Sequence, residues 1–163
     1  MKRYHEWLKN NMKYVVLFLG GLLVSFYIST NWYQLVLVRG DSMVPAYHNM
    51  QFTIIDRHAK DFTYGDIIAF ECGGLKSILI KRVAACPGDQ VVIKEGVLYV
   101  NDRVSSVYPE SVLFEYAGIA ENLIQLSDNQ YFVIGDNVKE SNDSRYQKVG
   151  CINAEDILGR TVG

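Results

Sequence analysis

The chain has 163 residues, a formal net charge of −2 at pH 7 and a hydrophobic content of 49%. This length suits one domain with a proper core, and the charge balance argues against a nucleic-acid-binding protein, which would carry a basic stripe. The histidines and cysteines form no recognisable zinc signature, so the sequence predicts neither a metal site nor a cofactor.

The chain has three cysteines, which form no CxxC pair: Cys72, Cys86 and Cys151. Because their number is odd, at least one thiol is free or pairs with another molecule. One disulfide between two of them is compatible with the sequence, which does not assign it.

The stretch from Tyr14 to Thr30 carries no formal charge and is rich in Val, Leu and Phe. It lies at the short end of the roughly 17–25 residues that a membrane-spanning helix needs. The residues before it are basic, so the positive-inside rule predicts a cytoplasmic segment at 1–13, a transmembrane anchor at 14–31 and an extracytoplasmic domain at 32–163. A cleaved secretory peptide is the alternative, but no Ala-x-Ala-like cleavage site lies near the end of the run.

The part of the chain from residue 32 onward alternates short apolar runs with glycine-containing turns, which is typical of a mostly-β domain. A looser stretch at about 108–129 predicts an insertion, whose Phe114 and Tyr116 we expect at the lipid interface together with Trp32. Strands are predicted at 35–38, 51–56, 67–71, 77–85, 90–94, 97–100, 130–134 and 157–162.

Ser42 follows the first of these strands, between Gly40-Asp41 and Pro45, in a pattern that predicts a bend presenting its hydroxyl. Lys81 lies inside an apolar strand, where it is either an edge lysine that blocks aggregation or a desolvated amine. An amine with its pKa lowered to about 7–8 could take the proton of Ser42, as in serine–lysine catalysis.

Four segments in this order resemble the boxes of bacterial type I signal peptidases, in their small single-anchor form. They are Gly40-Asp41-Ser42-Met43-Val44-Pro45, Gly65-Asp66-Ile67-Ile68-Ala69-Phe70, Lys81-Arg82-Val83-Ala84-Ala85-Cys86-Pro87-Gly88-Asp89, and Gly135-Asp136-Asn137 with Asp143-Ser144-Arg145. The resemblance covers essentially the whole chain. It implies a mostly-β signal-peptidase-like core with a short inserted region, preceded by one transmembrane helix.

The resemblance implies that Ser42 is the nucleophile, Lys81 the general base, Ser141 the serine that orients the lysine, and Asp143 with Arg145 a bracing ion pair. The substrates would be exported preproteins, bound as an added strand and cleaved after a small-x-small motif at the outer face of the plasma membrane. The implied partners are the lipid bilayer and the secretion machinery. The implied pocket walls are Val36, Val38, Met43, Leu79 and Ile80.

Gly40 stands where some members of that family carry a serine that helps to bind the oxyanion, which leaves the second oxyanion donor unassigned. Asp41 is expected to point away from the site, because a second negative charge there would be unfavourable. Two alternatives stay open at this stage. One is an autoproteolytic repressor-type serine–lysine protease, and the other is a non-cleaving assembly factor for secreted or pilus subunits.

Overall fold

The computed structural model of this protein describes residues 2–162, apart from the side chains of residues 2–10, 28 and 30. The chain divides into two compact units, Met1–Gln34 and Leu35–Gly163.

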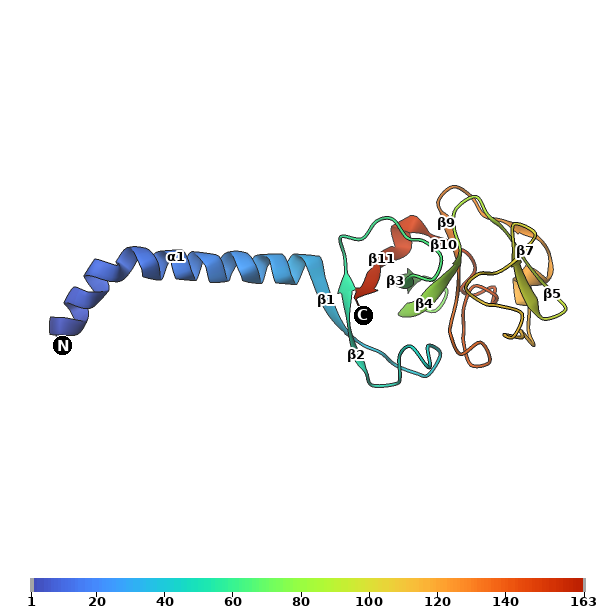
Figure 1. The fold of residues 1–163 in the computed structure, drawn as a ribbon, viewed down its shortest axis with the longest axis horizontal. Helices are drawn as coiled ribbons and strands as arrows, with labels where there is room; N and C mark the ends of the chain where they lie inside the picture. The colour runs from blue at the N-terminus through green and yellow to red at the C-terminus, as the bar shows by residue number, and fades with distance from the viewer. Residues whose placement is uncertain (1, 163) are drawn as a thin grey trace. The chain divides into compact units, whose positions relative to one another are not determined.

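The first unit is built on one helix, α1 (Lys2–Trp32), which leads into β1 (Tyr33–Leu37) (Figure 1). The residues predicted as an anchor, 14–31, all fall within this helix. Among the described residues, no helix is both long enough and apolar enough to cross a bilayer. Two side chains of the predicted span, at positions 28 and 30, lie outside the described residues, as do those of most of segment 1–13. The predicted transmembrane anchor is therefore not confirmed.

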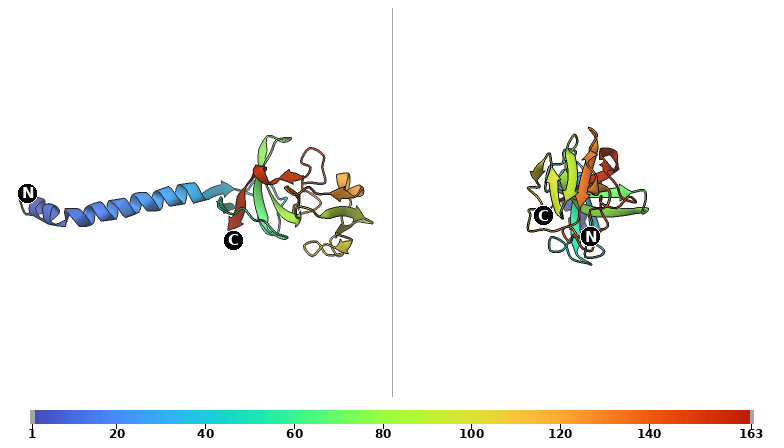
Figure 2. Two further views of the ribbon diagram at one scale, coloured as in Figure 1. Left: turned by 90° about the horizontal axis from the view of Figure 1, so that it is seen from above. Right: turned by 90° about the vertical axis from the view of Figure 1, so that its right-hand side faces the viewer.

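The second unit is a β-domain, as predicted, and its strands form two sheets (Figure 2). The seven-stranded sheet has the order β1-β2-β11-β3-β4-β9-β10, and the four-stranded sheet has the order β7-β6-β5-β8. The elements are β2 (Phe52–Asp56), β3 (Ile67–Cys72), β4 (Ser77–Ala85), β5 (Gln90–Lys94), β6 (Val97–Val100), β7 (Arg103–Val104), η1 (Gly118–Glu121), β8 (Ile124–Gln125), β9 (Gln130–Ile134), β10 (Ile152–Asn153), η2 (Ala154–Asp156) and β11 (Ile157–Val162).

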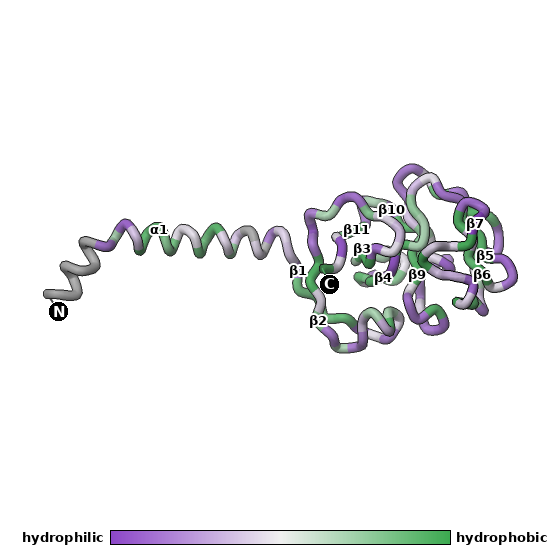
Figure 3. Tube along the Cα trace, viewed as in Figure 1, coloured by the Kyte–Doolittle hydropathy of each residue, from purple (hydrophilic) through white to green (hydrophobic). Residues whose placement is uncertain are grey.

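Strand β4 lies in the interior of the larger sheet, between β3 and β9, and both pairings are antiparallel. Lys81 pairs with Ile68 of β3, and Arg82 pairs with Ile134 of β9. Green stretches at β3, β4 and β9 in Figure 3 mark apolar residues, and most residues of these three strands are buried. An edge position for Lys81 is thereby excluded.

The predicted insertion is part of the smaller half of the domain rather than a loop facing lipid. It contains η1 and β8, and β8 extends the small sheet by pairing with β5. Phe114 is only 4% exposed and packs edge-on against Tyr108, with 5.8 Å between ring centroids. The expectation that Phe114 contacts lipid is therefore wrong, because its ring completes the core under the small sheet; Tyr116 is 49% exposed.

All three cysteines are free thiols. Cys72 is buried, and Cys86 and Cys151 are partly buried. Burial raises the pKa of the Cys86 thiol to about 11, so this thiol stays protonated at neutral pH and is a poor nucleophile. The disulfide that the sequence left open is not formed.

Candidate active site

Ser42 lies on a tight turn directly after the first strand of the domain. Gly40 adopts a φ of 85°, a left-handed conformation that favours glycine, and Val44 N–H donates to the carbonyl oxygen of Asp41 at 3.2 Å. Met43, next to the serine, is 1% exposed and packs with Val38, Tyr47 and Ile55. The buried methionine anchors the turn, so the neighbouring hydroxyl has a fixed position.

The carboxylate of Asp41 contacts the protein backbone. It accepts a hydrogen bond from the backbone N–H of Asn49 at 3.3 Å, and the residue is exposed. Asn49 also binds the turn with its side chain, because its Oδ1 accepts the N–H of Gly40 at 3.0 Å. The Gly40 N–H is thus occupied and does not serve as the unassigned oxyanion donor.

Lys81 reaches the serine from the middle of β4. Its Nζ donates to Ser42 Oγ at 2.7 Å and to the carbonyl oxygen of Ile80 at 3.0 Å. The side chain is buried, with 3% of its surface exposed. The two residues, far apart in sequence, are therefore within hydrogen-bond reach, as general-base catalysis requires.

Burial lowers the pKa of Lys81 from 10.5 to about 8. The carboxylates of Asp143 and Asp136 oppose this effect and keep the pKa from falling further. Desolvation dominates because the strand surrounds the amine with apolar groups, which stabilise the neutral form. A fraction of the amine is thus unprotonated near neutral pH, and it can accept a proton.

A cavity of about 450 Å³ opens beside the two side chains. One wall is the segment from Val36 to Arg39 and the other is the segment from Ile78 to Lys81, with Ser42 and Met43 between them. The structure thus brings together all five residues predicted as pocket walls, Val36, Val38, Met43, Leu79 and Ile80, around the serine and the lysine. The lining is aliphatic or thioether apart from Arg39, Ser42 and Lys81.

Asp143 and Arg145 form a buried ion pair, as predicted. The guanidinium donates through Nε to Asp143 Oδ1 at 2.8 Å and through Nη2 to Oδ2 at 2.9 Å, and both side chains are at most 2% exposed. Arg145 also donates to the carbonyl oxygens of Val138 and Tyr116, at 2.7 and 3.3 Å. These contacts tie the last part of the chain to the insertion and hold the loop next to the site.

Ser141 lies close to the site but does not bind the lysine in this structure. It is 1% exposed, and its Oγ makes no hydrogen bond to any described residue. It contacts Gly135 instead: a Cβ at Gly135 would collide with Ser141 Oγ and with the carbonyl oxygen of Ser42. The expected hydrogen bond from Ser141 to Lys81 is therefore absent, and the role of this serine in orienting the lysine stays a prediction.

Sequence reasoning assigned no role to a second ion pair. Arg82, which follows the lysine on β4, donates through Nε to Asp136 Oδ1 at 2.7 Å and through Nη1 to the carbonyl oxygen of Gly65 at 2.8 Å. Asp136 belongs to the loop that contacts the serine turn, where Asn137 N–H donates to the carbonyl oxygen of Ser42 at 3.1 Å. The opposite charges of Arg82 and Asp136, in the third and fourth of the four boxes, were the signal that could have predicted this pair.

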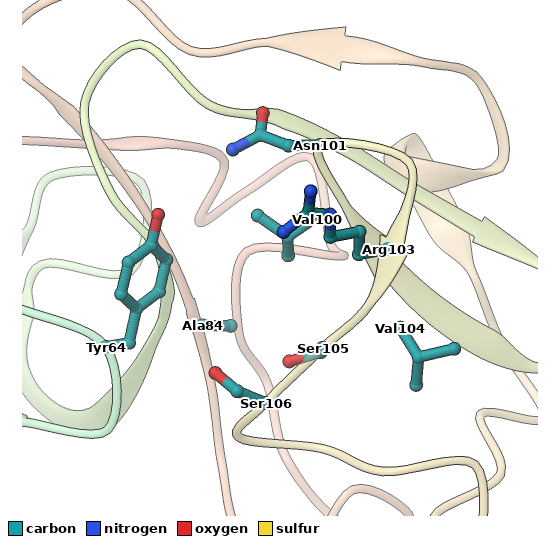
Figure 4. A pocket seen from close by; sticks show the side chains of 8 residues that line it. All are labelled: Tyr64, Ala84, Val100, Asn101, Arg103, Val104, Ser105 and Ser106. Atoms are coloured by element: carbon teal, nitrogen blue, oxygen red, sulfur yellow. The ribbon is translucent and has the colours of Figure 1, made fainter.

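A second cavity, of about 400 Å³, lies between Tyr64 and strands β6 and β7 (Figure 4). It contains neither Ser42 nor Lys81, and Ser105, which lines it, accepts the N–H groups of Val107 and Tyr108 at 3.2 Å. Burial and the hydrogen bond from Tyr64 to Asp89 raise the pKa of Tyr64 to about 12, so its phenol stays protonated. The contact between the Ser42 hydroxyl and the Lys81 amine lies at the first cavity.

Comparisons with known proteins identify the family of this chain. The protein family described as "Signal peptidase, peptidase S26" matches residues 11–163. The chain is 29% identical to signal peptidase I P of Bacillus subtilis subsp. natto, over 92% of this chain and 86% of that protein. It is 31% identical to signal peptidase I S of Bacillus subtilis (strain 168), over 94% of this chain and 84% of that protein.

A crystal structure of a signal peptidase I from Enterococcus faecalis V583 is 25% identical in sequence. It covers 61% of this chain and 96% of its own, with a TM-score of 0.48. The family match extends from α1 to the last strand and includes both the serine turn and the lysine strand. The chain therefore belongs to the peptidase S26 family of signal peptidases.

Proposed function

We propose that this signal peptidase cleaves its substrates with Ser42 as the nucleophile and neutral Lys81 as the general base. The observation that carries this proposal is the 2.7 Å separation between Lys81 Nζ and Ser42 Oγ inside an aliphatic cavity. The lowered pKa of the amine, about 8, supports it, because a base must be unprotonated to act. No histidine is needed for this arrangement.

In the first half of the reaction, the Lys81 amine takes the proton of the Ser42 hydroxyl while Oγ attacks the scissile carbonyl carbon. The resulting oxyanion is stabilised by backbone N–H donors at the serine turn. The Lys81 ammonium then gives its proton to the leaving amine, and the carbon–nitrogen bond breaks. The product is an ester between Ser42 and the signal peptide.

In the second half of the reaction, a water molecule takes the place of the released amine product. Lys81, neutral again, takes a proton from the water as its oxygen attacks the ester carbon. The ammonium returns a proton to Ser42 Oγ as the ester bond breaks, which restores the hydroxyl and releases the signal peptide. Asp143 supports this cycle from a distance by limiting how far the pKa of Lys81 falls.

The proposed substrate is the extended cleavage region of an exported preprotein, with small residues on both sides of a variable one. It would lie between the wall at Val36–Val38 and the wall at Leu79–Ile80, next to the free edge of the larger sheet, where β1 is the last strand. Main-chain hydrogen bonds along such an edge bind many sequences, while shallow pockets select small side chains. The cavity's aliphatic lining favours Ala-like groups over charged ones.

The proposed place of action is the membrane surface, with the β-domain outside. Support comes from α1, whose large apolar side chains at positions 16–19, 22–24 and 26 are all more than half exposed. Leu35 and Phe52, on the first two strands of the domain, are also exposed, by 66% and 63%. Burying such side chains in an apolar phase is favourable, so carbonate extraction of membranes should leave the full chain in the pellet. Recovery of the full chain in the extracted supernatant would refute membrane attachment.

The proposed reaction is tested with a peptide that carries a small-x-small cleavage motif and the full-length chain in detergent. We expect cleavage by the wild type and loss of cleavage in Ser42→Ala and in Lys81→Ala. Ser106→Ala and Lys94→Ala are the matched controls, because both side chains are exposed and away from the dyad, and both should cleave like the wild type. Equal cleavage by all five proteins would refute the dyad, and no cleavage by any of them would favour a non-cleaving assembly factor.

A further inference from the structure

The side chain of Asn137 binds the peptide group that precedes the nucleophile. Its Nδ2 donates to the carbonyl oxygen of Asp41 at 3.2 Å, and the backbone N–H of the same residue donates to the carbonyl oxygen of Ser42 at 3.1 Å. The carbonyl oxygens of the peptide groups before and after Ser42 are thus both bound by one residue from a distant loop.

The Asp41 oxygen accepts the hydrogen bond from Asn137 together with the one from Val44 N–H within the turn, and the two donors set the direction of the Ser42 N–H. The peptide between Asp41 and Ser42 is trans, and in a planar trans peptide the C=O and the N–H point in opposite directions. A donor bound to the Asp41 oxygen therefore sets where the Ser42 N–H points. Among the described residues, no acceptor binds the Ser42 N–H, whereas the Gly40 N–H is bound to Asn49. An unoccupied N–H next to the nucleophile is what stabilisation of an oxyanion requires.

The amide of Asn137 contacts acceptors of the protein itself. Besides the Asp41 carbonyl oxygen at 3.2 Å, its Nδ2 lies 3.5 Å from Glu140 Oε2. The loop that carries it is held to β4 by the ion pair between Asp136 and Arg82. Asn137 is therefore suited to act on the peptide group, through a rigid loop, rather than on the substrate directly.

We propose that Asn137 is a positioning residue that orients and polarises the backbone N–H of Ser42 as the oxyanion donor. The proposal rests on the proposed role of Ser42 as the nucleophile. A hydrogen bond to the carbonyl end of a peptide also strengthens its N–H as a donor, because successive hydrogen bonds polarise one another. Since the oxyanion exists only after attack, this effect belongs to the transition state and to tetrahedral adducts, and it is absent from the bound ground state.

The test compares Asn137→Ala with the wild type in the full-length chain. One oxyanion donor contributes about 10²–10³ in kcat, so a donor that is misdirected but still present should lower kcat by roughly tenfold to fiftyfold, with KM unchanged. Asn137→Gln keeps an amide donor and should recover part of this loss. Glu140→Ala removes the other partner of the same amide, and we expect wild-type kcat from it.

Two inhibitors built on the same small-x-small peptide separate positioning from a general loss of structure. A peptide aldehyde forms a tetrahedral adduct with Ser42 whose oxygen needs the N–H, whereas the corresponding alcohol binds without forming an oxyanion. In Asn137→Ala the aldehyde should weaken by the same factor as kcat, and the alcohol should bind as in the wild type. The pH at which kcat/KM reaches half its plateau should not move, because the Lys81 amine is untouched.

Ser42→Ala in the same assay shows whether the proposed function itself holds. If Ser42→Ala is inactive and Asn137→Ala keeps wild-type kcat, the positioning role is overturned and the serine–lysine mechanism stands. Equal weakening of the aldehyde and the alcohol in Asn137→Ala would also overturn it, because the residue would then support the cavity as a whole. If the wild type and Ser42→Ala cleave equally, both proposals fall.

Discussion

Replacement of Lys81 by methionine should separate the cost of burying the amine from its use in catalysis. The pKa of Lys81 is lowered from 10.5 to about 8 by burial, and at 1.36 kcal/mol per pKa unit this corresponds to about 3 kcal/mol of folding free energy. Methionine has a similar length and no charge, so Lys81→Met removes this cost. It also removes the hydrogen bonds to Ser42 Oγ and the Ile80 carbonyl, worth about 1 kcal/mol each.

The sign of the effect depends on pH. Between pH 8 and pH 10.5 the unfolded chain holds a proton on Lys81 that the folded chain has lost, so the stability of the wild type rises with pH in this window. Below pH 8 the amine is charged in both states and the full cost is present. At pH 7 we therefore expect Lys81→Met to be more stable than the wild type by about 1 kcal/mol, and above pH 10.5 less stable by about 2 kcal/mol.

Equilibrium urea unfolding of both full-length chains, followed by circular dichroism at several pH values, measures this difference. Lys94→Met is the matched control, since the Lys94 side chain is exposed on β5, and its difference from the wild type should not vary in the same window. The Lys81→Met chain should also be inactive. A stability difference between wild type and Lys81→Met that stays constant across the window would refute the buried amine.

Three further predictions concern the same site. The value of kcat/KM should rise about tenfold per pH unit up to about pH 8 and then level, because only the neutral Lys81 amine accepts a proton; a flat profile would point to another base. Gly135→Ala places a Cβ against the carbonyl oxygen of Ser42. Because a shift of about 1 Å near reacting atoms can lower the rate about 10²-fold, we expect kcat to fall by that order. Wild-type kcat would show that the turn tolerates the shift. Asp143→Asn leaves buried Arg145 without its charge partner, which should lower the free energy of unfolding in urea by about 3–5 kcal/mol. The same change should move the rise in kcat/KM to lower pH, because the Asp143 charge raises the pKa of Lys81. An unmoved pH profile would contradict that coupling.

The long strands of the domain were predictable because their sequence pattern is local. Residues 77–85, 90–94, 97–100, 130–134 and 157–162 are strands with the predicted bounds, each rich in residues that favour strands and most of them bounded by turn residues. The two-residue strands β7, β8 and β10 were missed because so short a segment becomes a strand only when a neighbouring strand pairs with it. Their formation depends on tertiary contacts that no short window of sequence contains.

The serine and the lysine were predictable for a different reason. Both belong to motifs whose order along the chain was recognisable, and Lys81 is conspicuous as a cation in an apolar strand. The surroundings of the dyad were less predictable. Phe114 could equally have faced lipid, and only the structure shows it packed against Tyr108 and 5.3 Å from the Arg145 guanidinium. Whether Ser141 reaches the lysine depends on side-chain geometry at the level of single ångströms, which motif order does not determine.

The loop at 135–137 contacts both the serine turn and the lysine strand, which supports the proposed pairing of Ser42 with Lys81. Asp136 binds Arg82, the residue next to Lys81 on β4, and Asn137 binds the carbonyl oxygens of Asp41 and Ser42. Gly135, which has no side chain, lets these contacts form at close range. Each contact acts on backbone or on a neighbouring residue, and none of the ion pairs among the described residues includes Lys81. A carboxylate bound directly to Lys81 would raise its pKa towards that of a free lysine, and the base would then be protonated at the pH where it must act.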